Sequence, residues 1–277
     1  MLNITSTKTL HNGVEMPRFG LGVYKMTDRE EAIQAMTTAI DTGYIAIDTA
    51  SLYNNEVEVG EAVKASNVRR EDLFITSKVW NADQGYDETL RAFETSLKKL
   101  DMDYLDLYLT HWAVPGKFKD TYRAIERLYD EKLLRATGVS NHQIHHLEEI
   151  FATANVKPMV NQIEVHPYLT QVEVRDFCTA NDIAVTAWSP LARGKIIDDA
   201  TITSIGQKYG KSAAQVVIRW HLQLGNIVIP KSVTPSRIKA NAQVFDFELT
   251  NEDMQLISAL NKDERTGADP DNFSFKF

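Results

Sequence analysis

Seven residues at the ends of successive β-type runs carry side chains that could do chemistry together. They are Asp48, Lys78, His111, Ser140, Gln162, Trp188 and Lys231. Six of them are polar, although a strand that ended inside an apolar core would not need a polar group there. In parallel α/β barrels, catalytic residues from different strands meet at the carboxyl ends of the strands. The set predicts an active site on that face, while solvent exposure alone would explain any single member.

Tyr53 lies five residues after Asp48, in the loop that follows the same run. An unperturbed tyrosine has a pKa of about 10 and is a weak proton donor at neutral pH. A nearby cation stabilises the phenolate and lowers that pKa, and a carboxylate behind the cation holds it in place. Asp48, Lys78 and Tyr53 therefore predict a general acid of lowered pKa, with His111 able to orient a substrate carbonyl. The structural alternatives are a salt bridge and a structural histidine.

The elements that must position these residues are short β-type runs alternating with amphipathic helical stretches, which is typical of βα units around a parallel sheet. The first helix is predicted from a capping box at Thr27 and Glu30 and an end at Gly43. The β-type runs are residues 19–23, 45–48, 73–78, 104–111, 135–140, 159–162, 183–188 and 227–231. Eight such runs predict a closed (β/α)8 barrel.

An open doubly wound sheet is the competing architecture, and it usually carries a G-x-G-x-x-G turn after an early strand. The GLG at 20–22 fails this fingerprint because Lys25 stands where the third glycine would be. Linker-like tracts are also absent, which favours a single domain over residues 1–277. An Asn12-Gly13 turn predicts an N-terminal β-hairpin that closes the bottom of the barrel.

Composition restricts the partners of this chain of 277 residues. Its formal net charge is −8 at pH 7, whereas nucleic-acid binding needs a clustered basic face, so we expect small-molecule partners and no nucleic acid. No apolar run approaches the roughly 18 residues of a spanning helix, and the N-terminus lacks a signal-peptide pattern. The single Cys178 suits a reducing compartment. We expect a cytoplasmic monomer that does not bind membranes.

The chain resembles the aldo-keto reductases along its whole length, in particular the bacterial 2,5-diketo-gluconate and glyoxal reductase group. The matching segments are GLGVYKM (20–26), DTGYIAIDTASLYNNEVEVG (41–60), LFITSKVW (73–80), YLDLYLTHW (104–112), TGVSNH (137–142), NQIEVHPY (161–168), AWSPLARG (187–194) and IPKSV (229–233). The resemblance implies NADPH-dependent reduction of aldehydes or ketones by hydride transfer. It also implies a catalytic tetrad of Asp48, Tyr53, Lys78 and His111, with Tyr53 as the proton donor.

The same resemblance implies a cofactor site. Ser140, Asn141 and Gln162 would hold the nicotinamide carboxamide. Trp188 would stack on the ring and fix which face presents its hydride. The remaining cofactor-binding positions are Ser189, Leu191, Lys231, Ser232, Val233, Thr234, Arg237 and Asn241. Ala240 stands where the family usually has a glutamate that contacts the adenine amino group.

A phosphate site is also indicated by the residues alone. Thr234-Pro235 predicts a helix start with a good N-cap, with Lys231 just before it and Arg237 in its first turn. Two cations at the positive end of a helix are unfavourable unless an anion binds there. Barrels often bind phosphate after strands seven and eight. Two solvated charges are the alternative reading, but we favour a 2′-phosphate and therefore NADPH over NADH.

The candidate substrate pocket has aromatic walls at Tyr24, Trp80, Trp112 and Phe273. Such walls suit small or apolar carbonyls without choosing among them. Ser51 stands where the family usually has alanine, and we expect it to make no contact with the tetrad.

Three histidines lie close together in sequence. His142, His145 and His146 are placed on one helix, with His142 and His146 at metal-ligand spacing. No Asp or Cys at a nearby strand end completes a ligand set, so we predict no metal.

Two other functions remain open from sequence. A Schiff-base aldolase would use Lys78, and borohydride with substrate would then trap a covalent product on that lysine. An NADPH-sensing regulatory protein would bind the cofactor without turnover.

Overall fold

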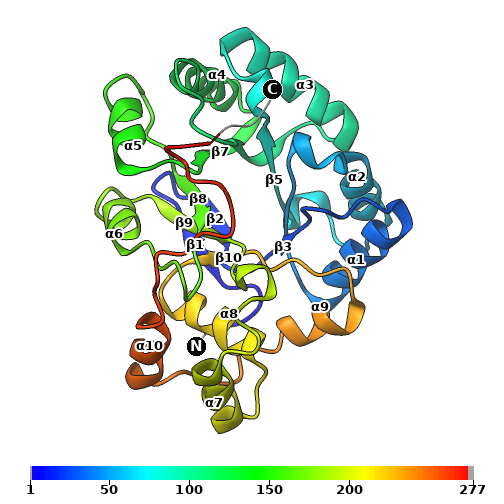
Figure 1. Cartoon of the computed structure of the whole chain (residues 1–277). Coiled ribbons are helices and arrows are strands. Elements are labelled where there is room, and N and C mark those ends of the chain that lie inside the picture. Colours follow the sequence, from blue (N-terminus) through cyan, green and yellow to red (C-terminus); the bar gives the residue numbers. More distant parts are fainter. Residues whose placement is uncertain (1, 274–277) are drawn as a thin grey trace.

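The computed structural model describes residues 2–273. Its centre is a parallel sheet with the strand order β10-β9-β8-β7-β6-β5-β4-β3, surrounded by helices (Figure 1). The two edge strands meet, because Phe19 and Val228 form a parallel bridge and the Gly20 N–H donates to the Val228 carbonyl at 3.1 Å. The sheet therefore closes on itself, which confirms the predicted (β/α)8 barrel.

The barrel strands are short, and almost all of their residues are buried, as expected for a parallel sheet covered by helices. Their bounds are β3 Leu21–Gly22, β4 Ala46–Asp48, β5 Phe74–Val79, β6 Leu105–Thr110, β7 Leu134–Ser140, β8 Val160–Glu164, β9 Ala184–Trp188 and β10 Ile227–Val228. Each predicted run overlaps one of them, although β5, β7 and β8 extend one or two residues beyond their runs. The last run was predicted too long, because Pro230 has no N–H to extend the ladder toward Lys231.

Ten α-helices and four 3-10 turns accompany these strands within residues 2–273, and the last two helices follow β10. The helices are α1 Arg29–Thr42, α2 Glu56–Ala65, α3 Tyr86–Leu100, α4 Phe118–Asp130, α5 Ile144–Phe151, α6 Val172–Ala180, α7 Ala200–Tyr209, α8 Ala213–Gln223, α9 Pro235–Asn241 and α10 Asn251–Ser258. The 3-10 turns are η1 Ser51–Tyr53, η2 Arg70–Asp72, η3 Asn81–Asp83 and η4 Ala192–Gly194.

The start of α1 differs from the prediction by one residue. Asp28, not Thr27, is the N-cap, and its carboxylate accepts a hydrogen bond from the Glu31 N–H at 2.9 Å. Both residue types are good N-caps, so local sequence alone does not choose between them. The predicted end is confirmed, because Gly43 has a φ of 103° and its N–H caps the last turn.

The predicted N-terminal hairpin is present. Strand β1, Thr7–Thr9, pairs antiparallel with β2, Glu15–Pro17, around a turn in which Gly13 has a φ of 86°. From this hairpin Leu10 and Met16 pack into an apolar cluster with the starts of the barrel strands. The hairpin therefore closes the end of the barrel opposite the strand carboxyl ends.

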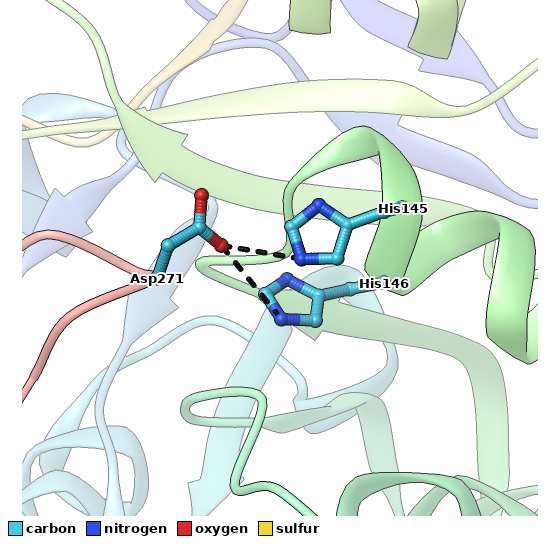
Figure 2. A group of neighbouring side chains, drawn as sticks. All are labelled: His145, His146 and Asp271. Carbon is cyan, nitrogen blue, oxygen red and sulfur yellow. Dashed lines mark ion pairs between the residues drawn. The ribbon is translucent and has the colours of Figure 1, made fainter.

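The segment that follows α10 runs back across the barrel toward α5 (Figure 1). Asp271 in this segment lies against His145 and His146 of α5 (Figure 2). Phe273 lies 5.1 Å from Trp112, measured between ring centroids. None of the helices within residues 2–273 combines the length and apolar character needed to cross a lipid bilayer.

Candidate active site

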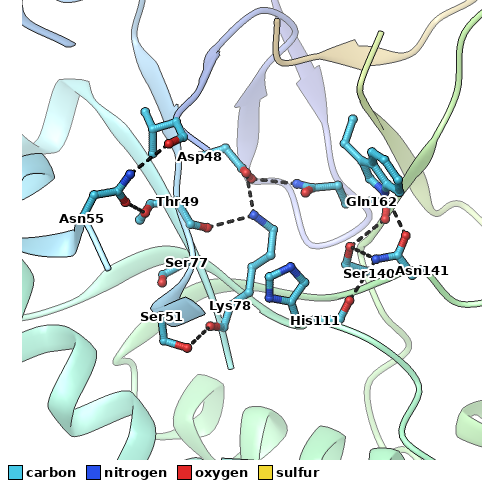
Figure 3. Close-up of polar contacts among 12 residues, drawn as sticks. Asp48, Thr49, Ser51, Asn55, Ser77, Lys78, His111, Ser140, Asn141 and Gln162 are labelled. Atoms are coloured by element: carbon cyan, nitrogen blue, oxygen red, sulfur yellow. Dashed lines mark hydrogen bonds and ion pairs between the residues drawn. The ribbon is translucent and has the colours of Figure 1, made fainter. Parts of the chain in front are cut away.

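A buried ion pair lies at the centre of the strand carboxyl ends (Figure 3). The ammonium of Lys78, whose side chain has no exposed surface, donates to Asp48 Oδ1 at 2.5 Å and to the Thr49 carbonyl at 2.8 Å. The other carboxylate oxygen of Asp48 accepts from Gln162 Nε2 at 2.7 Å. A buried charge needs such pairing, so these bonds fix the position of the lysine nitrogen.

Tyr53 and His111 lie next to this pair. The Lys78 Nζ is 5.1 Å from the centroid of the half-buried Tyr53 ring. The Tyr53 and His111 ring centroids are 5.7 Å apart with a T-shaped orientation. The structure thus brings together all four predicted tetrad residues, which come from β4, η1, β5 and the residue after β6.

The protonation states of these groups differ from the prediction. Burial raises the pKa of Tyr53 well above its ordinary value, and the negative charge of Asp48 raises it further. The predicted lowering by Lys78 is therefore wrong for the protein by itself, because burial and the charge of Asp48 both disfavour the phenolate. Burial lowers the pKa of Lys78, while the Asp48 charge opposes that shift. Tyr53 therefore carries its proton at neutral pH.

His111 is neutral at physiological pH. Burial lowers its pKa well below the ordinary value, and the charge of Lys78 lowers it further. Its Nδ1 is buried without a hydrogen-bond partner among the described residues. A neutral imidazole beside Tyr53 can hydrogen-bond a carbonyl oxygen without adding a second positive charge to the site.

The residues expected to hold a carboxamide also converge. Ser140 Oγ donates to the Gln162 carbonyl at 2.8 Å, and Asn141 Nδ2 donates to the His111 carbonyl at 3.0 Å. Asn141 Oδ1 accepts from the indole Nε1 of Trp188 at 2.8 Å. These bonds join the ends of β6, β7, β8 and β9 into one network beside the tetrad.

The loop after β9 has an unusual backbone. Ser189, Ala192 and Arg193 all adopt left-handed φ angles, of 47°, 47° and 54°. Non-glycine residues in this conformation cost energy and cluster at ligand sites. Ser189 and Leu191, both predicted cofactor contacts, lie in this loop, and Leu191 packs against two separate groups of buried apolar side chains in the core.

The predicted phosphate site is only partly built as expected. Helix α9 begins at Pro235 as predicted, but the Thr234 side chain makes no capping bond and the Thr234 N–H donates to Ser232 Oγ at 3.1 Å. Lys231 and Arg237 are exposed, and neither forms an ion pair within the described part of the chain. Val233 packs on the core, and Asn241 at the end of α9 is buried.

The predicted pocket walls form two aromatic groups. The ring centroid of Tyr24 lies 4.9 Å from that of Tyr53, and Trp80 lies 5.1 Å from His111. Trp112 and Phe273 form the second group, 5.1 Å apart. The first group contacts the tetrad directly, and the second is linked to it through Trp112, which follows His111 in the sequence.

Two residues that support the site were missed from sequence. Ser51 Oγ donates to the Lys78 carbonyl at 3.0 Å and accepts from the Trp80 N–H, so the expectation that Ser51 avoids the tetrad is wrong. Asn55 donates to the Val23 carbonyl at 2.9 Å and accepts from Thr49 Oγ1 at 2.7 Å. Their only signal in sequence was their proximity to Tyr53.

The histidine cluster differs from its prediction. His142 precedes α5 and is buried, so it does not share a helix face with His146. Ligand atoms of His145, His146 and Asp271 instead lie within 4.8 Å of one another (Figure 2). His146 Nδ1, however, accepts from the Gln143 N–H at 3.1 Å, which leaves the ring proton on Nε2, the atom that faces Asp271. This tautomer leaves no lone pair on Nε2 for a metal, and the absence of a metal stays a prediction.

Comparisons with known proteins agree with this arrangement. The model of the Aldo/keto reductase family matches residues 18–262. Glyoxal reductase of Bacillus subtilis is 56% identical over 273 residues, which cover 99% of each chain. The solved aldo-keto reductase MGS-M4, from a deep-sea metagenome library, has a TM-score of 0.95 at 43% identity, covering 97% of this chain and 100% of that one. A mutant of Gox0644 solved in complex with NADPH has a TM-score of 0.93 at 42% identity, covering 98% and 99%.

The fold and the site together define an oxidoreductase built on a parallel barrel. The chain belongs to the aldo/keto reductase family. This confirms the resemblance on which the sequence-based assignment depended.

Proposed function

We propose that the protein reduces small aldehydes and ketones with NADPH and that Tyr53 donates the proton. The observation that carries this proposal is the placement of a protonated Tyr53 between the buried Lys78 and the neutral His111. A proton donor, a cation and a neutral hydrogen-bonding group around one point are what carbonyl reduction requires.

When bound, NADPH supplies the hydride that reduces the carbonyl carbon. His111 holds the carbonyl oxygen near the Tyr53 hydroxyl. Tyr53 gives its proton to that oxygen as negative charge develops there, and Lys78 stabilises the resulting phenolate. Asp48 and the Thr49 carbonyl keep the ammonium in place during this change.

The residues present fit a nicotinamide cofactor. The side chains of Ser140, Asn141 and Gln162 offer amide and hydroxyl groups beside the tetrad, which suits a carboxamide. The indole of Trp188 offers an apolar face next to them. Lys231 and Arg237, without ion-pair partners in the described part of the chain, suit a 2′-phosphate.

The substrate class follows from the pocket walls. Tyr24 and Trp80 place aromatic surface against Tyr53 and His111, and Trp112, which follows His111 in the sequence, packs against Phe273. This aromatic surface favours small carbonyl compounds with little charge. The similar Bacillus subtilis protein is a glyoxal reductase, which supports short dicarbonyl compounds as the first substrates to test.

A panel of carbonyl compounds tests the proposal, with oxidation of NADPH followed by absorbance. We expect turnover of glyoxal and methylglyoxal by the natural sequence and almost none by Tyr53→Phe. Binding of NADPH without turnover of any carbonyl would support the regulatory alternative. Trapping of substrate on Lys78 by borohydride would support an aldolase and overturn the proposal.

A further inference from the structure

The segment after α10 contacts the indole of Trp188 through a single glycine. A Cβ atom on Gly267 would overlap Cη2 of Trp188 and lie 3.2 Å from its Cζ3. The outer edge of the Trp188 indole therefore packs directly against the backbone of Gly267. Only glycine allows this approach, because any side chain at this position would displace the ring.

One buried carboxylate fastens this segment to the barrel. Glu164, at the end of β8, is 1% exposed and accepts hydrogen bonds from the backbone N–H groups of Thr266, at 2.7 Å, and Gly267, at 3.1 Å. The hydroxyl of Thr266 and the Nε2 of His166 also contact it. Burial alone would raise the pKa of Glu164, but the bonds from His166, Thr266 and Gly267 lower it, so the carboxylate is ionised.

Glu164 and Trp188 are also direct neighbours in the barrel. They are register partners at the ends of the paired strands β8 and β9. Glu164, the neighbour of Trp188 in the sheet, therefore holds Gly267 against the far edge of the Trp188 indole. The opposite edge of the indole is held by the bond from its Nε1 to Asn141 Oδ1 at 2.8 Å. The ring is fixed at both edges.

We propose that Glu164 and Gly267 are positioning residues that set the plane of the Trp188 indole for cofactor binding. The proposal rests on the proposed function, in which the nicotinamide stacks on Trp188. A ring free to rotate would offer the same surface but would bind the cofactor less tightly, because stacking depends on a parallel face.

The chain provides a matched control for loss of the carboxylate. Glu126 in α4 is also buried and accepts two backbone hydrogen bonds from one loop, from the N–H groups of Asn155 at 2.6 Å and Val156 at 2.8 Å. Glu126→Gln therefore removes the same kind of anchor away from Trp188. A loss of stability that is equal in Glu126→Gln and Glu164→Gln would come from the lost backbone hydrogen bonds and not from a change at the Trp188 indole.

The test uses the full chain labelled with fluorotryptophan. Fluorine NMR then shows the tryptophans separately, and Trp188→Phe identifies the resonance of Trp188. Without cofactor, we expect this resonance to shift in Gly267→Ala and to shift and narrow in Glu164→Gln. In Glu126→Gln it should match the natural sequence. We further expect the NADPH Kd to rise about three- to tenfold in Gly267→Ala and Glu164→Gln and to stay unchanged in Glu126→Gln.

The two readouts separate this proposal from the proposed function. If Trp188 responds as expected in the absence of cofactor but the natural sequence binds no NADPH, the proposed function fails and the contact with the indole stands. If NADPH binds normally while the Trp188 resonance is the same in Gly267→Ala as in the natural sequence, the positioning role is overturned. Gly267→Ala keeps the test decisive should Glu164→Gln fail to fold.

Discussion

Lys78 and Asp48 form an ion pair whose nitrogen and oxygen atoms lie 2.5 Å apart and whose side chains are 0% and 8% exposed. Each charge depends on the other, because burial penalises both in the absence of a partner. Removal of either partner should therefore destabilise the barrel as well as disturb the chemistry beside it.

Loss of the ammonium should affect both properties. In Lys78→Met the Asp48 carboxylate remains buried without its cation, so we expect carbonyl reduction to be lost and the free energy of unfolding to fall by about 3–5 kcal/mol. Activity assays and chemical denaturation measure the two effects. Lys64→Met is the control, because the pair of Lys64 with Asp101 is exposed. Full activity in Lys78→Met would remove the lysine from the mechanism.

The hydroxyl of Tyr53 should matter for turnover and not for cofactor binding. Tyr53→Phe removes the proton donor and keeps the ring, so we expect kcat to fall by about 10²- to 10⁴-fold with an unchanged Kd for NADPH. Steady-state kinetics and a fluorescence titration measure these quantities. Tyr86→Phe, on α3, should behave as the natural sequence. A small change of kcat in Tyr53→Phe would assign the proton to another group.

Buried histidines should make the fold sensitive to acid. Burial lowers the pKa of His142 to about 3, and the same cause lowers the pKa of His221 to about 3. Between pH 6.5 and 3 the unfolded chain binds protons at these positions and the folded chain does not, so stability falls as pH falls. Each histidine should account for about 2 kcal/mol of the loss between pH 7 and pH 5.

Denaturation of His142→Gln at the two pH values tests this expectation. The variant should lose about 2 kcal/mol less than the natural sequence between pH 7 and pH 5, because glutamine binds no proton. His11→Gln is the control, since His11 is exposed. Equal pH dependence in all three proteins would mean that His142 is protonated in the folded state.

Recognition of the 2′-phosphate should depend on Arg237. Arg237→Ala should weaken NADPH by about 1.5–3 kcal/mol, or roughly ten- to a hundredfold, and leave NADH nearly unchanged. Titrations of both cofactors measure the difference. Lys239→Ala, on the same helix, controls for general loss of positive charge. Equal losses for NADH and NADPH would show that Arg237 does not contact the phosphate.

The architecture could be predicted because its signals are local. The alternation of β-type runs with helical stretches and the Asn12-Gly13 turn each depend on neighbouring residues, and the structure confirms both. Convergence of Asp48, Lys78 and His111 followed from one rule, that parallel strands end on the same face.

What the sequence did not predict depends on contacts between distant segments. The pKa of Tyr53 is raised by burial and by the charge of Asp48. The spacing of five residues between Asp48 and Tyr53 reveals neither the burial nor the direction of the shift. The contact of Asp271 with His145 joins the segment after α10 to α5, which is distant in sequence, so no local pattern could predict it. Ser51 shows a different limit, since the family resemblance marked it as a departure from the usual alanine without showing that its hydroxyl would reach the Lys78 carbonyl.

The closure between β3 and β10 has a consequence for the dynamics of the barrel. Both strands are only two residues long, and a Cβ on Gly22 would lie 2.8 Å from the Ile229 carbonyl oxygen, so the seam tolerates no larger residue there. With so few ladder bonds, this seam should open before the longer β5–β6 and β6–β7 pairs, and its amides should exchange with solvent fastest among the barrel strands. Lys231 lies three residues after the end of β10, so an anion bound there would also slow the opening of the seam.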